Sequence, residues 1–481
     1  MAASRSGGSG QGSGGTSRRS GRPDAAAREA ARLLDLRKRM REVEEAILAR
    51  APEHDLEPSL DRIQAVMELL GDPQRTFPSI HITGTNGKTS TARIIEAILR
   101  ESGLKTGRFT SPHLHTIRER ISIAGEPISE EAFLAAYDDV IPYIEMVDAQ
   151  SAETGGPRMT YFEVVVAVAY AAFADAPIDV AIVEVGMGGA WDATNVIDAT
   201  VSVVTPIDVD HTHFLGTTPE EIATEKVGII KPSGITVSAI QPHEDVWEMI
   251  RARSGEVDAH LVTEGLDFGI LTREVAVGGQ LLSLRGLAGD YEEVLLDLHG
   301  QFQAHNAVVA LAAVESFLGG GSQQVDPDVL RAALASVESP GRLEIVRRSP
   351  TVIVDAAHNA HGVAALAEAL SDSFTFTRLV GVVAIFRDKD AAEMLSLLEP
   401  VLDHIVVTRT TSLRATPPEQ LGEIAVDIFG EQRVTVVRDL PNALDAAAEL
   451  ADEGGVGGAV LATGSVFTAA EVRMLLGVTS A

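Results

Sequence analysis

The chain has 481 residues, of which 45% are hydrophobic and 22% are charged, and its formal net charge is -30. This length exceeds what one hydrophobic core usually supports, so two domains are expected, and the acidic balance excludes partners such as nucleic acids and anionic membranes. The absence of cysteine excludes disulfides, thiolate metal sites and cysteine nucleophiles, and we expect a monomeric, cytoplasmic enzyme that acts on small molecules.

The N-terminal segment is rich in glycine, serine and arginine and lacks the apolar stretch of a signal peptide. We expect residues 1–30 to form a disordered tail. The pattern over residues 25–50 is helical and heavily charged, and a further helix is predicted to begin after Pro58 and Ser59. The most apolar run, residues 164–174, falls far short of the roughly 20 residues that a membrane span needs.

A short apolar strand, a glycine turn and the start of a helix follow one another from Ile80 to Ser90. The turn Gly84-Thr85-Asn86-Gly87-Lys88-Thr89-Ser90 predicts a phosphate-binding loop, because glycines let backbone N–H groups surround an oxyanion. The helix adds the positive end of its dipole, Lys88 adds a charge, and the next two residues offer hydroxyls. The general nucleotide-loop motif has glycine where this chain has Ile82, so an ordinary structural turn is the alternative.

Polar residues follow several strands of the predicted sheet. Strands are predicted at residues 108–110, 180–185 and 199–205, and the last two are continuous apolar runs, as a sheet buried on both faces requires. The polar residues at these strand ends are the loop Ser111–Leu114, Glu184, Asp208, Asp210 and His211. Such groups would suit magnesium held against nucleotide phosphates, although a strand-end glutamate can also be a helix cap or a surface partner.

The second half of the chain restarts the alternation of strands and helices. Residues 259–298 predict short strands with glycine turns, residues 303–318 predict a helix, and Ser339-Pro340-Gly341 interrupts the pattern. Further strands are predicted at residues 351–355, 379–385, 404–408, 433–438 and 458–462. We therefore predict an α/β protein with a P-loop-containing, mostly parallel, doubly wound domain that binds ATP at residues 31–338 and a smaller Rossmann-like domain at residues 339–481.

A second ligand-binding turn is predicted at Asp355-Ala356-Ala357-His358-Asn359-Ala360-His361-Gly362, between a strand and an alanine-rich helix. Its polar side chains would suit a ribose or a substrate carboxylate, although a histidine there could be a helix cap. Arg342 could reach into a cleft between the domains or lie on the surface. Lys226 lies in a helix of mixed charge, where a solvated lysine is the simplest interpretation.

Taken together, these residues resemble a known family, the folylpolyglutamate synthases and dihydrofolate synthases of the bifunctional bacterial type, in the Mur ligase superfamily. The resemblance extends from about Ser59 to the C-terminus. The matching motifs are Gly84–Lys88, Ser111–Leu114, Thr160–Glu163, Gly188-Gly189 with Asp192–Asn195, Asp210-His211, Glu225–Ile229, His305–Ala307, Gly341-Arg342 and Asp355–Asn359.

The resemblance implies a set of site residues. ATP phosphates would bind at Asn86, Gly87, Lys88, Thr89 and Ser90, with Asn306 and Arg342 on the adenine side and Asp355 near the ribose. Magnesium, expected as two ions, would be held by Ser111, Glu184 and His211. The pterin end of the substrate would meet Leu60, Asp61, Arg62, Thr160, Tyr161, Phe162, Glu163, Trp191, Asp192 and Ala193.

The resemblance also implies the chemistry. A substrate carboxylate would attack the γ-phosphate of ATP, and the amino group of L-glutamate would then displace phosphate from the acyl phosphate, with ADP and phosphate as products. Lys88, Lys226 and His358 are the expected catalytic residues, and Lys226 resembles the family's N6-carboxylated lysine, an anionic oxygen ligand for the second magnesium. The acceptor would be dihydropteroate, a reduced folate or both.

The sequence departs from the usual folate-branch motifs at two places, and two rival functions are compatible with it. Thr89 stands where the folate branch usually has glycine, as in the cell-wall branch, and Ala190-Trp191 replaces the usual Arg-Leu. The first rival is a Mur-type cell-wall ligase that acts on a UDP-sugar-peptide. The second is a nucleotide-dependent regulatory switch that binds nucleotide without ligating glutamate.

Overall fold

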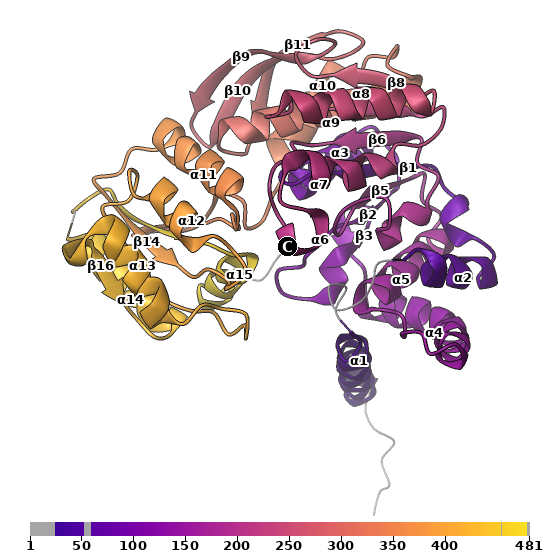
Figure 1. Cartoon of the computed structure of the whole chain (residues 1–481), viewed down its shortest axis with the longest axis horizontal. Helices are drawn as coiled ribbons and strands as arrows, with labels where there is room; N and C mark the ends of the chain where they lie inside the picture. Colours follow the sequence, from indigo (N-terminus) through magenta and orange to yellow (C-terminus); the bar gives the residue numbers. More distant parts are fainter. Residues whose placement is uncertain (1–24, 52–58, 454, 479–481) are drawn as a thin grey trace, which may run out of the picture.

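The computed structural model describes residues 25–51, 59–453 and 455–478. These residues form sheets of eight, three and six strands, and the described strands of one sheet do not pair with those of another. In Figure 1 the six-stranded sheet and its helices, in orange and yellow, lie beside the larger N-terminal part of the chain. None of the described helices is both long and apolar enough to cross a membrane.

The eight-stranded sheet has the order β4-β3-β2-β5-β1-β6-β7-β8. Its strands are β1 (Ser79–Thr83), β2 (Thr106–Phe109), β3 (Ile121–Ile123), β4 (Glu126–Pro127), β5 (Val180–Glu184), β6 (Val201–Val204), β7 (Ile235–Ser238) and β8 (His260–Thr263). All neighbours from β2 to β8 pair in parallel, and β3 and β4 form an antiparallel edge. The predicted mostly parallel α/β sheet is therefore confirmed, and β1, β5 and β6 are buried along their whole length.

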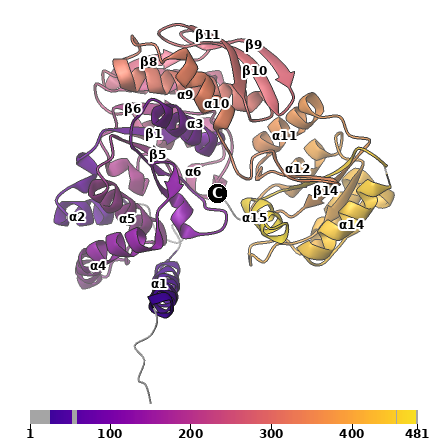
Figure 2. The same ribbon diagram turned by 180° about the vertical axis from the view of Figure 1, so that it is seen from behind.

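Helices cover both faces of this sheet (Figure 2). One face carries α3 (Lys88–Glu101), α9 (Gln301–Gly319) and α10 (Pro327–Ser336), whose apolar side chains share one core with the sheet. The other face carries α1 (Ala25–Leu48), α2 (Asp61–Leu69), α4 (Glu130–Glu153) and α5 (Tyr161–Asp175). The short helices α6 (Thr212–Leu215) and α7 (Pro219–Lys226) and helix α8 (Glu244–Glu256) contribute a smaller cluster near β6.

A three-stranded antiparallel sheet packs on α9 and α10. Its strands are β9 (Gly269–Ala276), β10 (Gly279–Arg285) and β11 (Asp290–Leu296), in the order β11-β10-β9. The alternating pattern of residues 259–298 predicted these strands. Only the structure shows that β8 belongs to the large sheet, whereas β9 to β11 form a separate one.

The C-terminal sheet has the order β12-β13-β17-β14-β15-β16 and is parallel except for β12. Its strands are β12 (Glu344–Arg348), β13 (Thr351–Val354), β14 (Arg378–Val383), β15 (His404–Val407), β16 (Val434–Val436) and β17 (Gly458–Thr463). One face is covered by α11 (Ala360–Ser373), α12 (Ala391–Leu398) and α13 (Pro418–Phe429), and the other by α14 (Leu440–Asp452) and α15 (Val466–Leu475). The proposed domain boundary at residue 339 lies in the connection between α10 and β12.

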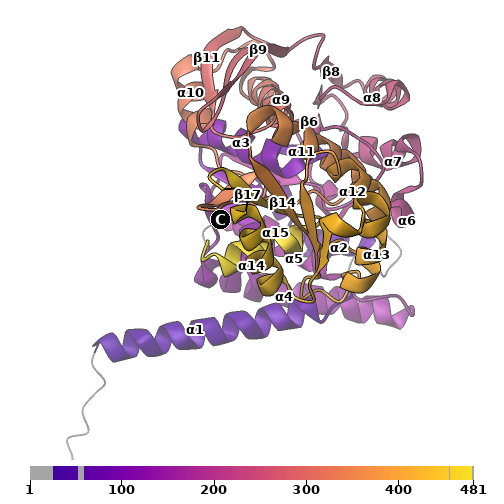
Figure 3. The same ribbon diagram turned by 90° about the vertical axis from the view of Figure 1, so that its left-hand side faces the viewer.

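The predicted N-terminal tail needs one correction. Helix α1 begins at Ala25, so residues 25–30 are helical, and residues 1–24 lie outside the described part of the chain. Figure 3 shows α1 extending beyond the body of the protein. Its last turns bury Met40, Val43 and Ile47 against α4 and α5, which explains why an apolar stripe continues into this charged segment.

Candidate active site

The phosphate loop lies between β1 and α3, at the carboxyl edge of the large sheet. Gly84 has φ 143°, and a Cβ there would lie 1.9 Å from Thr205 Oγ1, so only glycine permits this turn. Lys88 Nζ donates to the carbonyl oxygens of Gly84 (2.9 Å) and Thr85 (3.0 Å). Burial lowers the pKa of Lys88, and the nearby carboxylate of Glu184 partly offsets this effect.

Three predicted nucleotide and metal residues converge beside this loop. Thr89 Oγ1 donates to both carboxylate oxygens of Glu184 (2.8 and 3.0 Å), and the backbone N–H of Ser111 donates to Glu184 Oε2 (3.2 Å). Glu184 is 1% exposed, and its burial raises its pKa, whereas Lys88 and the Thr89 hydroxyl lower it. The strand ends of β2 and β5 therefore bring hydroxyl and carboxylate oxygens to the start of α3.

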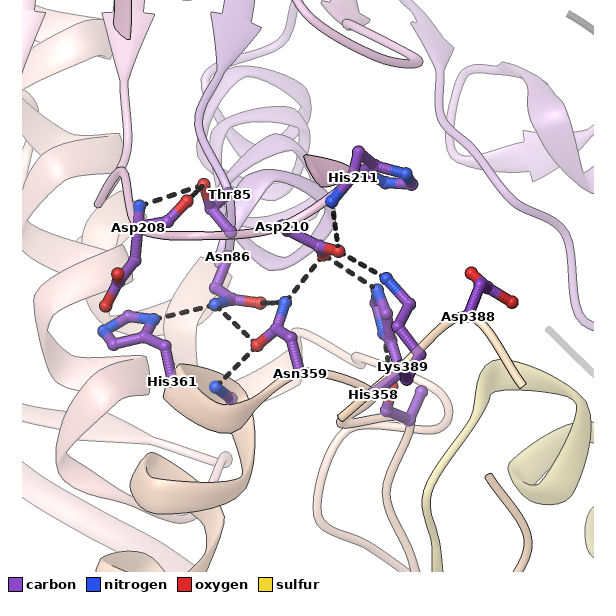
Figure 4. Close-up of polar contacts among 12 residues, drawn as sticks. Thr85, Asn86, Asp208, Asp210, His211, His358, Asn359, His361, Asp388 and Lys389 are labelled. Carbon is purple, nitrogen blue, oxygen red and sulfur yellow. Dashed lines mark hydrogen bonds and ion pairs between the residues drawn. The ribbon is translucent and has the colours of Figure 1, made fainter. Parts of the chain in front are cut away.

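The predicted metal ligand His211 does not take part in the hydrogen bonds around Glu184. Its backbone N–H donates to Asp210 Oδ1 (2.7 Å), and Figure 4 shows its ring pointing away from Asp210. No hydrogen bond or ion pair joins the His211 ring to Ser111 or Glu184 in the described residues. Likewise, the described part of the chain contains no group of three or more His, Cys, Asp or Glu side chains close enough to hold a metal ion.

Asp210 connects the two halves of the protein (Figure 4). Its carboxylate pairs with Lys389 Nζ and accepts from Asn359 Nδ2 (2.8 Å), and His358 Nε2 lies 3.4 Å from Oδ2. Burial raises the pKa of Asp210, but the His358 contact and the charges of His211 and Lys389 outweigh it and hold the pKa well below its usual range. Asn86 of the phosphate loop also reaches the C-terminal half, where its Nδ2 lies 2.7 Å from His361 Nδ1.

Lys226 is buried, contrary to the solvated lysine that is the simplest interpretation of its charged helix. It ends α7, is 4% exposed, and its Nζ donates to Gly84 O at 2.9 Å. Burial and the charge of Lys88 lower its pKa to about 7, so near neutral pH a large fraction of the amine is uncharged. This tertiary contact places Lys226 against the phosphate loop.

Comparisons with known proteins place this geometry in a family. The model of the Mur ligase middle domain matches residues 82–314, and that of the Mur ligase glutamate ligase domain matches residues 341–466. The chain is 49% identical over 455 residues to the dihydrofolate synthase/folylpolyglutamate synthase of Mycobacterium tuberculosis, covering 91% of this chain and 93% of that protein. The chain belongs to this family of Mur ligases.

Other family members support the same assignment. The Bacillus subtilis dihydrofolate synthase/folylpolyglutamate synthase is 32% identical over 422 residues, which cover 88% of this chain and 95% of that protein. The structure of Mycobacterium tuberculosis folylpolyglutamate synthase complexed with ADP and AMPPCP superimposes with a TM-score of 0.88 at 47% identity, covering 93% of this chain and 100% of that one. Escherichia coli FolC in complex with DHPP and ADP gives a TM-score of 0.78 at 29% identity, covering 91% and 97%.

Of the residues predicted for the adenine and ribose, Asn306 lies against Gly87 of the phosphate loop, and Asp355 directly follows β13 in the C-terminal half. Asn306 is 6% exposed, and its Oδ1 would lie 2.6 Å from a Cβ at Gly87. Asp355 accepts the backbone N–H groups of Ala357 and Leu343 (both 2.8 Å), and burial raises its pKa while Arg342 lowers it. Ser90 Oγ lies 3.0 Å from Ser339 Oγ at the domain connection.

The residues predicted for the pterin differ in how much surface they offer. Thr160 and Glu163 form the capping box of α5, and Glu163 also pairs with Arg62 (3.0 Å). Tyr161 is partly exposed under the guanidinium of Arg120, 5.2 Å from the ring centroid, and Phe162 is buried. Leu60 and Arg62 are partly exposed and Asp61 is exposed. The start of α2 is therefore accessible to a ligand.

Asp192, which is predicted to meet the pterin, is buried within its own loop. It is 0% exposed and accepts the N–H groups of Met187 and Thr194 (both 2.9 Å) and the Thr194 hydroxyl. Burial raises its pKa. Asp192 therefore holds its own loop together, and its contact with the pterin stays a prediction. Ala193 is also buried, so Trp191, which is partly exposed, is the accessible residue of this segment.

The sequence prediction missed Lys389, and it placed Asn359 and His361 in the second ligand-binding turn without pairing either of them with the phosphate loop or Asp210. Lys389 follows β14 and His361 lies in the first turn of α11, both at the carboxyl edge of the C-terminal sheet. The rule that ligand residues follow buried strands could have identified the segment Asp388-Lys389-Asp390. It could not have paired Lys389 with Asp210, because that contact depends on how the two sheets face one another.

Proposed function

We propose that this enzyme adds L-glutamate to dihydropteroate, to the γ-carboxylate of reduced folates, or to both, with ATP cleaved to ADP and phosphate. The chain is a Mur ligase, and its family members are ATP-dependent glutamate ligases. The observation that carries the proposal is the contact between Asn86 of the phosphate loop and the turn at Asn359 and His361. This contact brings the proposed triphosphate site and the glutamate ligase domain to one interface.

The proposed reaction proceeds through an acyl phosphate. The acceptor carboxylate attacks the γ-phosphorus and ADP leaves, after which the amino nitrogen of glutamate attacks the acyl carbon and phosphate leaves. Lys88 and the N-terminus of α3 stabilise the charge on the transferred phosphoryl group. We assign to His358, which is paired with Asp210, the uptake of the proton that the amino nitrogen loses as the amide bond forms.

The donor atoms beside the phosphate loop suit magnesium. Glu184 offers a carboxylate and Thr89 a hydroxyl, which are the oxygen ligands that Mg²⁺ prefers, and nucleotide phosphates supply others. Bound Mg²⁺ would neutralise charge on the phosphate oxygens. We propose that Ser111 and His211 complete the two-ion set, with the His211 ring turning toward Glu184 when nucleotide binds.

We propose that Lys226 is N6-carboxylated in the active enzyme. Carbamate formation requires an uncharged amine, and the buried Lys226 amine has a pKa of about 7 and faces the phosphate loop. A ¹³C NMR signal that appears with ¹³C-bicarbonate and is absent from Lys226→Met would support the carbamate. Short-chain carboxylic acids should partly restore the activity of Lys226→Ala, and an unchanged activity of Lys226→Ala would remove the residue from the mechanism.

A cationic cavity in the C-terminal half could receive the carboxylates of glutamate. It has a volume of about 390 Å³, and its charged lining residues are three arginines and two acids, Arg387, Arg409, Arg438, Asp439 and Glu471. It also contains the buried Thr410 hydroxyl, which has no hydrogen-bond partner in the described structure. Arg387 precedes Lys389 by two residues, so the cavity adjoins the loop that contacts Asp210. Guanidinium groups bind carboxylates in a bidentate manner, which supports this assignment.

The acceptor would enter from the large domain. Arg62, Tyr161 and Trp191 offer partly exposed side chains there, and Escherichia coli FolC, a family member, has been solved with DHPP and ADP. We propose that the enzyme acts as a cytoplasmic monomer. The relatives named above make a cell-wall ligase or a nucleotide switch the weaker alternatives.

ADP release measured with purified protein, ATP, Mg²⁺ and glutamate tests the proposal. Dihydropteroate, tetrahydrofolate and a UDP-muramoyl-peptide should be compared as acceptors, and the products identified by mass spectrometry. We expect a glutamyl adduct with one or both pteridine acceptors. Amide formation only with the UDP-linked peptide, or nucleotide binding without any adduct, would overturn the assignment.

A further inference from the structure

Asn359 lies where three parts of the protein meet: the phosphate loop, helix α11 and the loop between β6 and α6, residues 205–211, which we call the Asp210 loop (Figure 4). Its Oδ1 accepts from Gly362 N (2.8 Å) and from Asn86 Nδ2 (3.2 Å). Its Nδ2 donates to Asp210 Oδ2 (2.8 Å) and to Asn86 Oδ1 (3.3 Å). Both amide hydrogens and both lone pairs of the oxygen are therefore used, and the residue is 6% exposed.

The other common capping residues, aspartate and serine, cannot make this set of contacts. The cap of α11 needs a short side-chain acceptor, which aspartate and serine also provide, but aspartate cannot donate to Asp210. Serine has a single donor hydrogen, so it cannot donate to both Asp210 and Asn86. Gly362 contributes by its lack of a side chain, since a Cβ there would lie 3.0 Å from Asn359 Oδ1 and 3.5 Å from Asn86 Oδ1.

The two N-terminal partners of Asn359 are joined to each other. Thr85 N donates to Pro206 O (2.9 Å), Thr85 Oγ1 donates to Asp208 O (2.8 Å), and Asp208 N donates to Thr85 Oγ1 (3.0 Å). The phosphate loop and the Asp210 loop thus form one unit. Lys389 binds the same Asp210 carboxylate from a different C-terminal loop, so the two domains meet at two points around one anion.

We propose that Asn359 is a positioning residue that holds the C-terminal domain against the phosphate loop, so that the acyl phosphate forms only where glutamate can reach it. This inference rests on the proposed function. When the contact is lost, the domains separate more often and water can attack the acyl phosphate. That attack regenerates the acceptor carboxylate and releases phosphate, so ATP is consumed without an amide bond being formed.

Two variants of Asn359 separate this role from capping of α11. Asn359→Asp retains the capping acceptor and has nearly the same shape, but it loses both donors and faces Asp210 with a like charge. Asn359→Ser also retains a cap and adds no charge. We expect the ratio of ADP released to glutamate ligated to rise severalfold in both, and the ligation rate to fall about tenfold or more in Asn359→Asp. The KM for ATP should change little, because Lys88 and the loop glycines remain.

The exchange variant Asp210→Asn/Asn359→Asp is the matched control. It restores one carboxylate and one amide at the same two positions, with the donor on the opposite side. If the bond between the two residues couples the domains, the exchange variant should have a lower ratio of ADP released to glutamate ligated than either single variant. Thermal midpoints of all variants separate a loss of coupling from a loss of folding.

Domain separation can be measured directly because the chain has no cysteine. Met146→Cys on α4 and Val456→Cys in the C-terminal half replace exposed side chains and give two unique labelling positions. With a non-hydrolysable ATP analogue bound, the distance distribution between the labels should be narrow in the labelled parent and broader after Asn359→Asp.

The outcomes are separable. If the unmodified enzyme forms no glutamyl product, the proposed function fails. If the unmodified enzyme ligates glutamate, but Asn359→Asp and Asn359→Ser keep its ratio of ADP to product and its distance distribution, the positioning role of Asn359 is refuted.

Discussion

At the scale of single residues, burial decides the chemistry of the two lysines beside the phosphate loop. Lys88 and Lys226 both donate to Gly84 O, at 2.9 Å each, and burial lowers the pKa of each one. Two ammonium groups so close together repel one another, which further favours loss of a proton from Lys226. The pair therefore places two desolvated amines on one carbonyl oxygen of the predicted phosphate loop.

Replacing Lys88 tests the phosphate assignment. Lys88→Ala should lower kcat/KM for ligation by about 100-fold or more, because the developing charge on the phosphoryl group loses its nearest cation. Lys38→Ala, which removes a 70% exposed side chain on α1, is the control and should leave turnover unchanged. Steady-state ADP release measures both, and near-normal activity of Lys88→Ala would contradict the phosphate site.

The lowered pKa of Lys226 predicts a pH dependence of stability. Its pKa is about 7 in the folded protein and 10.5 ordinarily, so between these values the unfolded chain binds a proton that the folded protein does not. The free energy of unfolding should therefore rise with pH in this window, by at most about 1.4 kcal/mol per pH unit from this residue. Below pH 7 both states are protonated and the contribution becomes constant at its least favourable value.

Lys226→Met should remove this dependence. Urea denaturation at pH 6.5 and pH 9, with EDTA and without carbon dioxide, should show a gain in stability for the variant that is larger at pH 6.5. Equal differences at the two pH values would mean that the amine is not desolvated in the folded protein.

At the scale of elements, the turn between β1 and α3 depends on backbone conformations that only glycine adopts easily. Gly87 is the residue before α3, has φ 86°, and would bring a Cβ to 2.6 Å from Asn306 Oδ1. Gly103, after the same helix, has φ 87°, but a Cβ there would meet nothing within 4 Å. The helix thus has matched glycines at its two ends, one crowded and one open.

This pair gives a controlled prediction. Gly87→Ala and Gly103→Ala should both lose roughly 1–2 kcal/mol of stability from the left-handed backbone alone. Only Gly87→Ala should also displace Asn306 and weaken ATP binding by about tenfold or more. Calorimetric titration with a non-hydrolysable ATP analogue and urea denaturation measure the two effects, and equal nucleotide affinities would contradict the crowding.

At the scale of the whole molecule, the apolar cores belong to separate halves. The buried members of three clusters come from residues up to Val337, and those of two others from Leu343 onward. Phe302 of α9 is a partly buried residue that packs across this division. The contacts at Asn86, Asp210 and Asn359 are polar, so the halves are expected to unfold as distinct cooperative units.

The two tryptophans allow this to be measured. Trp191 and Trp247 both lie in the N-terminal half, so tryptophan fluorescence follows that half alone, whereas far-UV circular dichroism follows both. We expect the two denaturation curves to differ without ligand, and a saturating non-hydrolysable ATP analogue to raise the midpoint of the less stable half. A single coincident transition without ligand would show that the halves unfold together.

Local patterns made most of the fold and part of the site predictable from the sequence. Continuous apolar runs such as residues 180–185 predict parallel strands buried on both faces, and the turn from Gly84 to Ser90 predicts a phosphate loop, because neighbouring residues alone set these features. The resemblance to folylpolyglutamate synthases added the ligase assignment, which the relatives bear out. The residue roles within the site stay predictions.

Tertiary structure decided which side chains are buried and which partners they meet. The charged helix around Lys226 does not by itself decide between a solvated and a buried lysine, whereas in the structure α7 packs this last residue against Gly84. Asp192 stands in a family motif, yet its own loop uses its carboxylate. Residues 149 positions apart meet in the bond from Asn359 to Asp210. The sequence by itself determined the strands, the turns and the residue types at the strand ends. The packing of the two domains against each other determined which of these side chains are buried and which charges they pair with. Both properties depend on contacts between residues far apart in the chain.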